Sequence, residues 1–403
     1  MSYFSLPYIN NILHTHNFDF KIEIKKQMIH PTINKSLFNY INLIKQQIDD
    51  NIEQWDIVKR YTNPYEYIHT AVPQTNQAVS KYIPISRSYF KMIEIFKTFF
   101  ILEYLDKDPI CTFHLAEGPG GFIEAIVNKR NNSSDKYYGM TLQSQSEQVP
   151  GWKKSRKFLQ KYKNVIIENG EDGTGNLYKR ENLEYCYRKY RNSMNLITGD
   201  GGFDYSIDFN KQEILSSRLI FSQVIYAIIM QKKNGVFILK IFDVFDKFTV
   251  DIIYFLNILY DQVLITKPLT SRLANSEKYL VCKGFRLDNS DCYYSMFLSF
   301  FDEMSKYDND INISPYDLSI SNLLKIKIPY YFTIKLEEIN AVIGQHQVEN
   351  INSTINLIHN NIKKDKLENL KRNNIQKSVQ WCIKHKIPYN KTAPQSNIFL
   401  TRR

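Results

Sequence analysis

From about residue 84 onward, short apolar runs alternate along the chain with longer stretches of helical period. The runs have the length of buried strands, and the stretches place their apolar residues on one helical face. Strands are predicted at residues 110–116, 137–142, 165–168, 195–199, 235–241, 262–267 and 278–284. Helices are predicted at residues 86–104, 122–129, 211–231 and 248–259. This alternation predicts crossover units and a mostly parallel sheet covered by helices on both faces.

The last two predicted strands, residues 262–267 and 278–284, are joined by a segment too short for a helical crossover. One of the two strands is therefore expected to run antiparallel. The patterned part of the chain, residues 84–289, is predicted to be one α/β domain.

The two ends of the chain lack this alternation. Residues 1–83 are predicted to be a helical extension with a helix near residues 35–57, and residues 290–403 to be a mostly helical region that ends in a helix near residues 371–386. Charge runs in the second region are expected to be solvated faces rather than binding sites.

The chain of 403 residues carries 52 Lys and Arg against 41 Asp and Glu, a formal charge of +11. This excess suits a polyanionic partner, although many soluble proteins are basic without one. The five cysteines are widely spaced and form no C-x-x-C pair, which predicts neither a disulfide framework nor a zinc site. His14 and His16 lack the other ligands of a metal site, so no metal is expected. Without a signal sequence or an apolar run that could span a bilayer, a soluble protein in a reducing compartment is expected.

A glycine-rich turn, E-G-P-G-G-F at residues 117–122, follows the first predicted strand and precedes a helix. Glycines there let the backbone pass close to a ligand, and the helix start offers N–H donors. The pattern is neither the G-x-G-x-x-G of dinucleotide binders nor a phosphate loop. The turn predicts a nucleotide-like cofactor without identifying it.

Five segments, taken together, resemble the FtsJ-like RNA 2′-O-methyltransferases, particularly the cap-specific messenger RNA branch. They are HLAEGPGGF at 114–122, TGDGGF at 198–203, FILKIFD at 237–243, KPLTSRLANSEKY at 267–279 and, less specifically, SRSYFK at 86–91. The likeness spans about residues 84–286 and keeps the family's order. It implies a Rossmann-like class I methyltransferase with a mostly parallel seven-stranded sheet, helices on both faces and helical extensions at both ends.

The resemblance implies a catalytic tetrad formed by Lys91, Asp200, Lys240 and Glu277, with S-adenosyl-L-methionine as cofactor. It assigns cofactor binding to Glu117, Gly118, Pro119, Gly120, Gly121, Phe122, Asp172 and Asp200. One departure concerns the second predicted strand, which ends Gly-Met-Thr-Leu at 139–142 without the acid that many methyltransferases use for the ribose hydroxyls.

The proposed reaction explains these residue types. A ribose 2′-hydroxyl must lose its proton as it attacks the methyl group, and the reacting atoms must be aligned. A lysine serves as base only if burial or a nearby cation lowers its pKa. Lys240, at the end of an apolar strand, is the predicted base, with Lys91 as the second cation and two carboxylates to orient the ammonium groups.

RNA contacts are expected from cations and aromatic rings near this group, because single strands are held by phosphate contacts and stacking. The candidates are Arg87, Tyr89, Phe242, Phe245 and Arg272. For the aromatic residues, core packing is the alternative, and for Phe242 and Phe245 the two readings stay equal.

The sequence therefore predicts methylation near the cap of messenger RNA, with contacts from the terminal regions to capping or transcription machinery. The alternatives are the same reaction on ribosomal or transfer RNA, a non-catalytic RNA-binding scaffold, and a nicotinamide-dependent oxidoreductase, which the missing G-x-G-x-x-G disfavours. The richness in Asn, Ile, Lys and Tyr is typical of AT-rich coding, as in large DNA viruses of the cytoplasm or AT-rich protists. A viral source would place the protein in the cytoplasm, and the nucleus stays the alternative.

Overall fold

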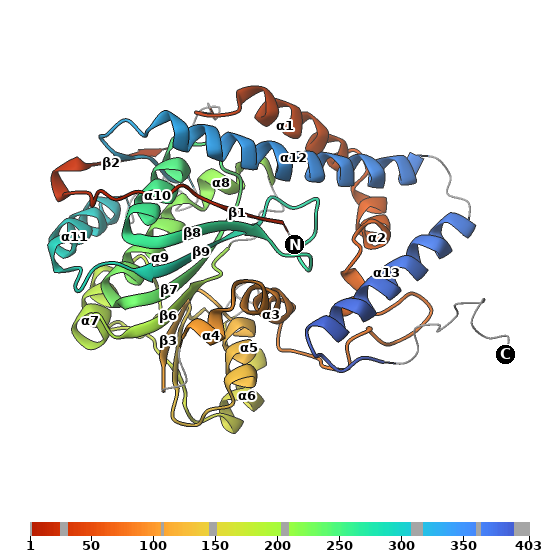
Figure 1. The fold of residues 1–403 in the computed structure, drawn as a ribbon, viewed down its shortest axis with the longest axis horizontal. Helices are drawn as coiled ribbons and strands as arrows, with labels where there is room; N and C mark the ends of the chain where they lie inside the picture. Colours follow the sequence, from red (N-terminus) through yellow and green to blue (C-terminus); the bar gives the residue numbers. More distant parts are fainter. Residues whose placement is uncertain are drawn as a thin grey trace.

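The computed structural model describes residues 2–24, 31–105, 109–144, 151–202, 209–307, 317–359 and 364–390. Its centre is an eight-stranded sheet in the order β1-β8-β9-β7-β6-β3-β4-β5 (Figure 1). The strands are β1 (Ser2–Ser5), β3 (Cys111–Leu115), β4 (Lys136–Met140), β5 (Val165–Ile167), β6 (Met194–Gly199), β7 (Gln231–Ile241), β8 (Tyr260–Lys267) and β9 (Lys278–Phe285).

Strands β3 to β7 run parallel to one another, whereas β9 runs antiparallel to both β7 and β8. The prediction that one of the last two strands is antiparallel is confirmed. The predicted Rossmann-like α/β architecture is confirmed as well. Its seven strands are joined by an eighth, β1, which pairs with β8 at the edge of the sheet.

Helices cover both faces of the sheet because neighbouring residues of each strand enter opposite cores. In β7, Phe237 and Leu239 belong to one core, and Val236 and Ile238 to the other. The first core is closed by α7 (Arg180–Tyr190), α9 (Ser217–Met230), α10 (Lys247–Leu259) and α11 (Asp291–Ser305). The second is closed by α3 (Ser88–Phe99), α5 (Gly121–Arg130) and α6 (Arg156–Lys161). The short elements are η1 (Thr15–Asn17), η2 (Glu66–Ile68), α4 (Ile101–Tyr104), η3 (Lys153–Ser155), η4 (Phe209–Lys211) and α8 (Gln212–Leu215).

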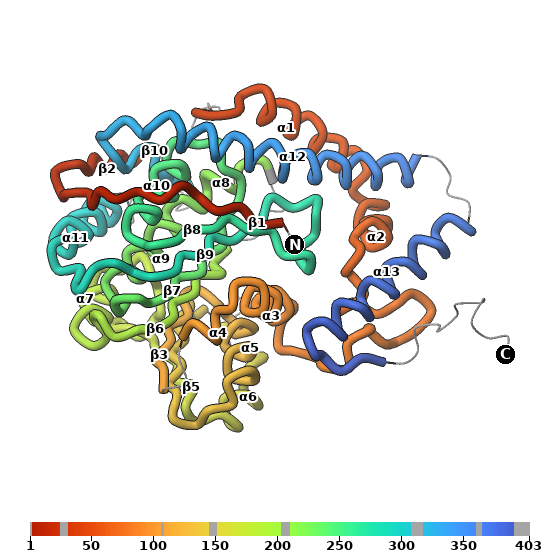
Figure 2. The backbone as a smooth tube through the Cα atoms, in the orientation of Figure 1, coloured from red at the N-terminus to blue at the C-terminus, as the bar shows by residue number. Residues whose placement is uncertain are grey.

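The two ends of the chain pack on each other, as the red and blue parts of the tube show (Figure 2). The helices α1 (Lys35–Asp49) and α2 (Ile52–Thr62) lie against α12 (Tyr330–His359), and α13 (Lys364–Lys384) contacts α2 and η2. A small apolar cluster, which contains Trp55, Ile351 and Phe245, joins these ends to the loop that follows β7.

Residues 1–83 are not only helical, as the sequence analysis had it. They also form β1 and β2 (Phe18–Ile24), and β2 pairs with β10 (Leu318–Leu324). Both strands lie at or outside the edge of the main sheet. The four residues of β1 are too few to show a period, but β2 has the sequence FDFKIEI, whose apolar and polar residues alternate as in a strand, a signal that the sequence analysis missed. The helix expected at residues 35–57 is two helices, α1 and α2, and no helix of the described residues could cross a membrane.

Candidate active site

Three of the four predicted catalytic residues lie at one edge of the sheet, where the parallel strands end. Asp200 follows β6, Lys240 is the next-to-last residue of β7, and Glu277 precedes β9. The strand register places Gly199 opposite Leu239, and Lys240 opposite Tyr279. Asp200 and Glu277 therefore reach Lys240 from the two strands that flank β7.

The four residues form two ion pairs. Lys240 Nζ lies 3.3 Å from Asp200 Oδ1 and donates to the Asp200 carbonyl oxygen at 2.7 Å. Lys91, which α3 supplies, lies with its Nζ 2.7 Å from Glu277 Oε1. The side chain of Lys240 is 12% exposed and that of Lys91 is 5% exposed, so Lys240 is the more accessible of the two amines.

Two residues that the sequence analysis did not select connect these pairs. The Tyr279 hydroxyl donates to Asp200 Oδ1 at 3.0 Å, and its ring lies 5.9 Å from Lys91 Nζ. The Ser271 hydroxyl donates to Glu277 Oε1 at 2.8 Å. Both residues lie inside the 267–279 segment, but only the pairing of β7 with β9 shows that Tyr279 faces the site.

The two pairs act on each other electrostatically. Burial raises the pKa of the Glu277 carboxyl, but the ammonium groups of Lys91 and Lys240 outweigh burial and hold this pKa well below its usual range. Burial lowers the pKa of Lys91, and the charges of Glu277 and Asp200 oppose that shift. The two lysines and two carboxylates thus form one charge cluster at the sheet edge.

Glycines after Asp200 leave the room that Lys240 occupies. A Cβ at Gly202 would lie 3.1 Å from Lys240 Nζ, and one at Gly201 would lie 2.8 Å from a Leu219 methyl group. Gly202 thus packs closely against the amine and Gly201 against Leu219, so the two glycines allow close packing as well as a turn. Phe203, the last residue of that segment, lies outside the described residues.

The glycine-rich turn lies beside this cluster, between β3 and α5. Glu117 Oε1 accepts hydrogen bonds from the backbone N–H groups of Phe122 and Ile123, which begin α5. Its other oxygen, Oε2, lies 3.1 Å from His114 Nδ1. Glu117 is 3% exposed and burial raises its pKa. Both oxygens of Glu117 are therefore engaged in shaping the turn, and its contact with the cofactor stays a prediction.

The backbone of the turn is held close to its neighbours. Gly120 has a φ of 103°, and a Cβ at Gly121 would lie 2.2 Å from the hydroxyl oxygens of Ser86 and Ser88. The turn therefore tolerates no larger residue at either position. The turn places backbone without bulky side chains next to the Asp200 carboxylate. A carboxylate is a suitable neighbour for a cationic methyl donor.

A loop at residues 170–175 lies beside the end of β4. The Gln143 N–H donates to the Thr174 carbonyl oxygen at 2.7 Å, and a Cβ at Gly175 would lie 2.2 Å from the Thr141 carbonyl oxygen. Asp172 accepts from the Thr174 N–H at 2.9 Å and from Asn182 Nδ2 at 2.9 Å. The strand β4 ends without an acid, and this loop, which carries the predicted cofactor residue Asp172, lies beside that end.

The loop that carries Glu277 is anchored from α3. The Glu94 carboxylate, one turn after Lys91, accepts from the N–H groups of Leu269 at 2.8 Å and Thr270 at 3.2 Å. From within the sheet, Lys267 Nζ donates to the Glu277 carbonyl oxygen at 2.8 Å. Burial lowers the pKa of Lys267 to about 7. None of these anchors was predicted, because each depends on a contact between distant parts of the chain.

The predicted RNA contacts differ in availability. Arg87 is half-buried and forms no ion pair with any residue that the structure describes, and its charge lowers the pKa of both Lys91 and Glu277. The three aromatic candidates are almost fully buried. Their exposed fractions are 3% for Tyr89, 6% for Phe242 and 3% for Phe245. Core packing, the alternative reading, describes these rings better than stacking on RNA.

Arg272 was expected to contact phosphate, but the structure pairs it with Glu66. Its guanidinium donates to Glu66 Oε2 at 3.0 Å and Oε1 at 2.6 Å, a two-bond arrangement suited to arginine and carboxylate. Glu66 lies in η2, so this pair ties the Glu277 loop to the N-terminal segment. The phosphate assignment does not fit a guanidinium that is already neutralised in this way.

Glu66→Gln is expected to destabilise the protein at pH 7 by about 3 kcal/mol, because the folded pKa of Glu66 is about 2 and its usual value is 4.5. Burial raises this pKa, but Arg272 lowers it more. A lowered folded pKa stabilises above the unfolded pKa, and that contribution disappears as the pH falls from about 4.5 to about 2. Urea unfolding at several pH values measures it. Glu53→Gln, at an exposed position of α2, is the control. If Glu66→Gln lowered the free energy of unfolding equally at pH 7 and pH 3, the ion pair would not be the source of the stability.

No cluster of metal-ligating side chains occurs among the residues that the structure describes. Comparison with known proteins addresses the cofactor instead. Residues 84–285, half of the 403-residue chain, match a protein-family model described as FtsJ-like methyltransferase.

Three curated relatives carry the name cap-specific mRNA (nucleoside-2′-O-)-methyltransferase 1. The protein of Mus musculus is 33% identical over 199 residues, which are 47% of this chain and 23% of that protein. That of Trypanosoma brucei brucei is 37% identical over 177 residues, 42% of this chain and 45% of that protein. That of Trypanosoma cruzi is 33% identical over 215 residues, 50% of this chain and 56% of that protein. The matched segment thus spans between about a quarter and just over half of these relatives.

Proposed function

The chain belongs to the FtsJ-like methyltransferase family, and we propose that it transfers the methyl group of S-adenosylmethionine to a ribose 2′-hydroxyl of RNA. The observation that supports this reaction best is the cluster of two ion pairs, Lys240 with Asp200 and Lys91 with Glu277, beside the glycine-rich turn. S-adenosylmethionine is the cofactor of this family, and it supplies an electrophilic methyl group on a sulfonium centre.

We assign the proton acceptor to Lys240. Its side chain is the more exposed of the two lysines, and its Nζ is held by the carbonyl and carboxylate oxygens of Asp200. In this assignment Lys240 acts as the neutral amine, which accepts the proton of the 2′-hydroxyl as the oxygen attacks, while Asp200 keeps the amine in place and pairs with the ammonium group that forms. Lys91 is tied to Glu277 and, with Ser271 and Tyr279, holds the geometry of the cluster.

A non-catalytic scaffold that merely keeps the fold is the rival reading from another functional class. It would not need two lysines buried with two carboxylates, since burying charges costs free energy even when they are paired. The intact cluster at residues 91, 200, 240 and 277 therefore favours an enzyme.

The proposed substrate is the cap-proximal nucleotide of messenger RNA, because the curated relatives over the matched segment bear that name. The catalytic part is proposed to be residues 84–289. The terminal regions, 1–83 and 290–403, are proposed to contact RNA or other capping proteins, and the same reaction on ribosomal or transfer RNA is the alternative.

Methylation of matched RNAs by labelled S-adenosylmethionine tests the cap assignment. An RNA with a methylated guanosine cap is expected to react at least about tenfold faster than the same RNA with a 5′-triphosphate, since one well-made recognition contact is worth about 1–3 kcal/mol. A folded transfer RNA serves as the third substrate. Equal rates on capped and uncapped RNA would overturn the cap assignment but leave the 2′-O-methyltransferase assignment standing.

A further inference from the structure

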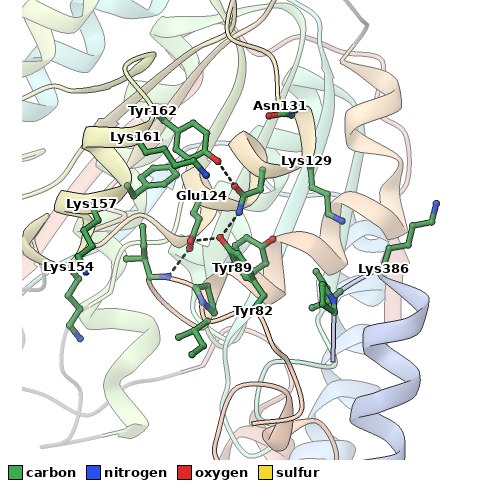
Figure 3. Close-up of a pocket in the computed structure, with 17 residues that line it drawn as sticks. Tyr82, Tyr89, Glu124, Lys129, Asn131, Lys154, Lys157, Lys161, Tyr162 and Lys386 are labelled. Carbon is green, nitrogen blue, oxygen red and sulfur yellow. Dashed lines mark hydrogen bonds between the residues drawn. The ribbon is translucent and has the colours of Figure 1, made fainter. Parts of the chain in front are cut away.

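A pocket of about 610 Å³ lies apart from the catalytic cluster, on the side of α5 that faces away from the sheet (Figure 3). Its walls are the segment 82–85, which leads into α3, the helices α5 and α6, and residues 386–388 after α13. None of the four proposed catalytic residues lines it. The proposed reaction therefore leaves this pocket without a role.

The floor of the pocket is a chain of hydrogen bonds. Glu124 Oε1 accepts from the Tyr82 hydroxyl at 2.7 Å, and Oε2 accepts from the Ile85 N–H at 2.8 Å. Asn128 donates to the Tyr82 oxygen at 2.6 Å, and the Tyr162 hydroxyl donates to Asn128 Oδ1 at 3.3 Å. This network joins three separate segments of the chain, so the pocket has a fixed shape before any ligand arrives.

The rim of the pocket is strongly basic. It carries five exposed lysines, Lys129, Lys154, Lys157, Lys161 and Lys386, whereas Glu124 is the one carboxylate among the lining residues. The lysines of the α6 side face those of the other side across the opening (Figure 3). Lys154, Lys157, Lys161 and Lys386 form no ion pair within the described parts of the chain. Burial lowers the pKa of Lys129, and the nearby charges of Lys386 and Lys97 lower it further, which shows that cations are close together here.

We propose that this pocket binds the sugar-phosphate backbone of the RNA strand beyond the methylated nucleotide, with the lysines on phosphates and Tyr82 and Tyr162 against ribose or base. The proposal rests on the proposed function and extends it to a second RNA contact. Cations that follow a backbone, combined with aromatic rings, are typical of proteins that bind single strands.

The path from the catalytic cluster to the pocket is short along the chain. Tyr82 and Ile85 line the pocket, Arg87 follows without an ion pair to any described residue, and Lys91 lies one turn further on. A strand whose hydroxyl reaches Lys240 beside Lys91 can thus continue past Arg87 toward the lysines of α6. An acidic protein segment would use the lysines but not the aromatic floor, which is why RNA is the favoured occupant.

Direct RNA binding without S-adenosylmethionine tests the proposal. The variant is Lys157→Gln with Lys161→Gln, and the control is Lys325→Gln with Lys327→Gln, which removes the same charge from exposed positions outside the pocket. The probes are a capped dinucleotide and a capped single-stranded RNA of about 20 nucleotides, longer than one binding site of this kind. Binding is followed by fluorescence anisotropy or calorimetry over a range of salt concentrations.

For the long RNA, the pocket variant is expected to reduce the slope of log K against log salt by about 1.4, which corresponds to about 25-fold between 1 M and 0.1 M salt. Affinity for the capped dinucleotide should be unchanged, and the control should match the parent protein. Equal losses for both RNAs, or unchanged binding of the long RNA, would overturn the proposal. The proposal would also be overturned if the pocket variant bound a labelled glutamate-rich peptide more weakly than the parent protein does but bound the long RNA equally well. Because this experiment measures binding and not methyl transfer, its result can be interpreted even if the methylation assay shows no activity.

Discussion

Lys240→Met is expected to lower the rate of methyl transfer by about 10²- to 10⁴-fold, the usual contribution of a proton-transfer group. Methionine keeps the length and apolar stem of lysine but can neither accept the hydroxyl proton nor bond to Asp200. Since Lys240 follows a buried apolar stretch of β7, the substitution should not open the core. The measurement is single-turnover transfer from labelled S-adenosylmethionine to RNA.

A matched control is Lys232→Met, at the exposed beginning of the same strand, which should keep full activity. Cofactor affinity, measured by calorimetry, should stay within a few-fold of the parent value in both variants, because the glycine-rich turn lies on β3 and α5 rather than on β7. Loss of cofactor binding together with activity would make Lys240 a structural residue. Full activity of Lys240→Met would remove it as the base.

The positions of Asp200 and Lys240 could be predicted because they depend on a general property of parallel sheets. The carboxyl ends of neighbouring strands meet at one edge, so polar residues that end β6 and β7 come together whatever the details of packing. The alternation of strands and helices fixed the fold class in the same way, because apolar periodicity is a local signal.

Residues whose roles arise from contacts between distant segments could not be predicted. The sequence predicted that Arg272 would be available to bind phosphate, because its partner Glu66 lies 206 positions away in the chain. Glu94 has no motif, yet it holds the Glu277 loop from 175 positions away. Strand β1 pairs with a partner far along the chain and is four residues long, so its sequence carries no clear period. Strand β2, by contrast, alternates apolar and polar residues over Phe18–Ile24 and could have been predicted from its sequence.

Glu277→Leu is expected to destabilise the protein by about 3–5 kcal/mol, because it leaves the buried Lys91 ammonium without its carboxylate. The sign of the pH dependence follows from the lowered pKa of Glu277. Its ion pair stabilises above the usual carboxyl pKa, and that contribution is lost as the pH falls. The difference between parent and variant should therefore shrink in acid. Urea unfolding at neutral and acidic pH measures it.

Adding Lys91→Met to Glu277→Leu should recover most of the lost stability, since a buried ion pair replaced by apolar groups of similar size is often nearly neutral. Methyl transfer should not recover, because the double variant still lacks the charges that position the cluster around Lys240. Glu213→Leu, which removes another buried carboxylate outside the cluster, controls for burial alone and should not be rescued by Lys91→Met. If the double variant regained both stability and activity, Lys91 and Glu277 would be a structural pair only, and catalysis would rest on Lys240 and Asp200.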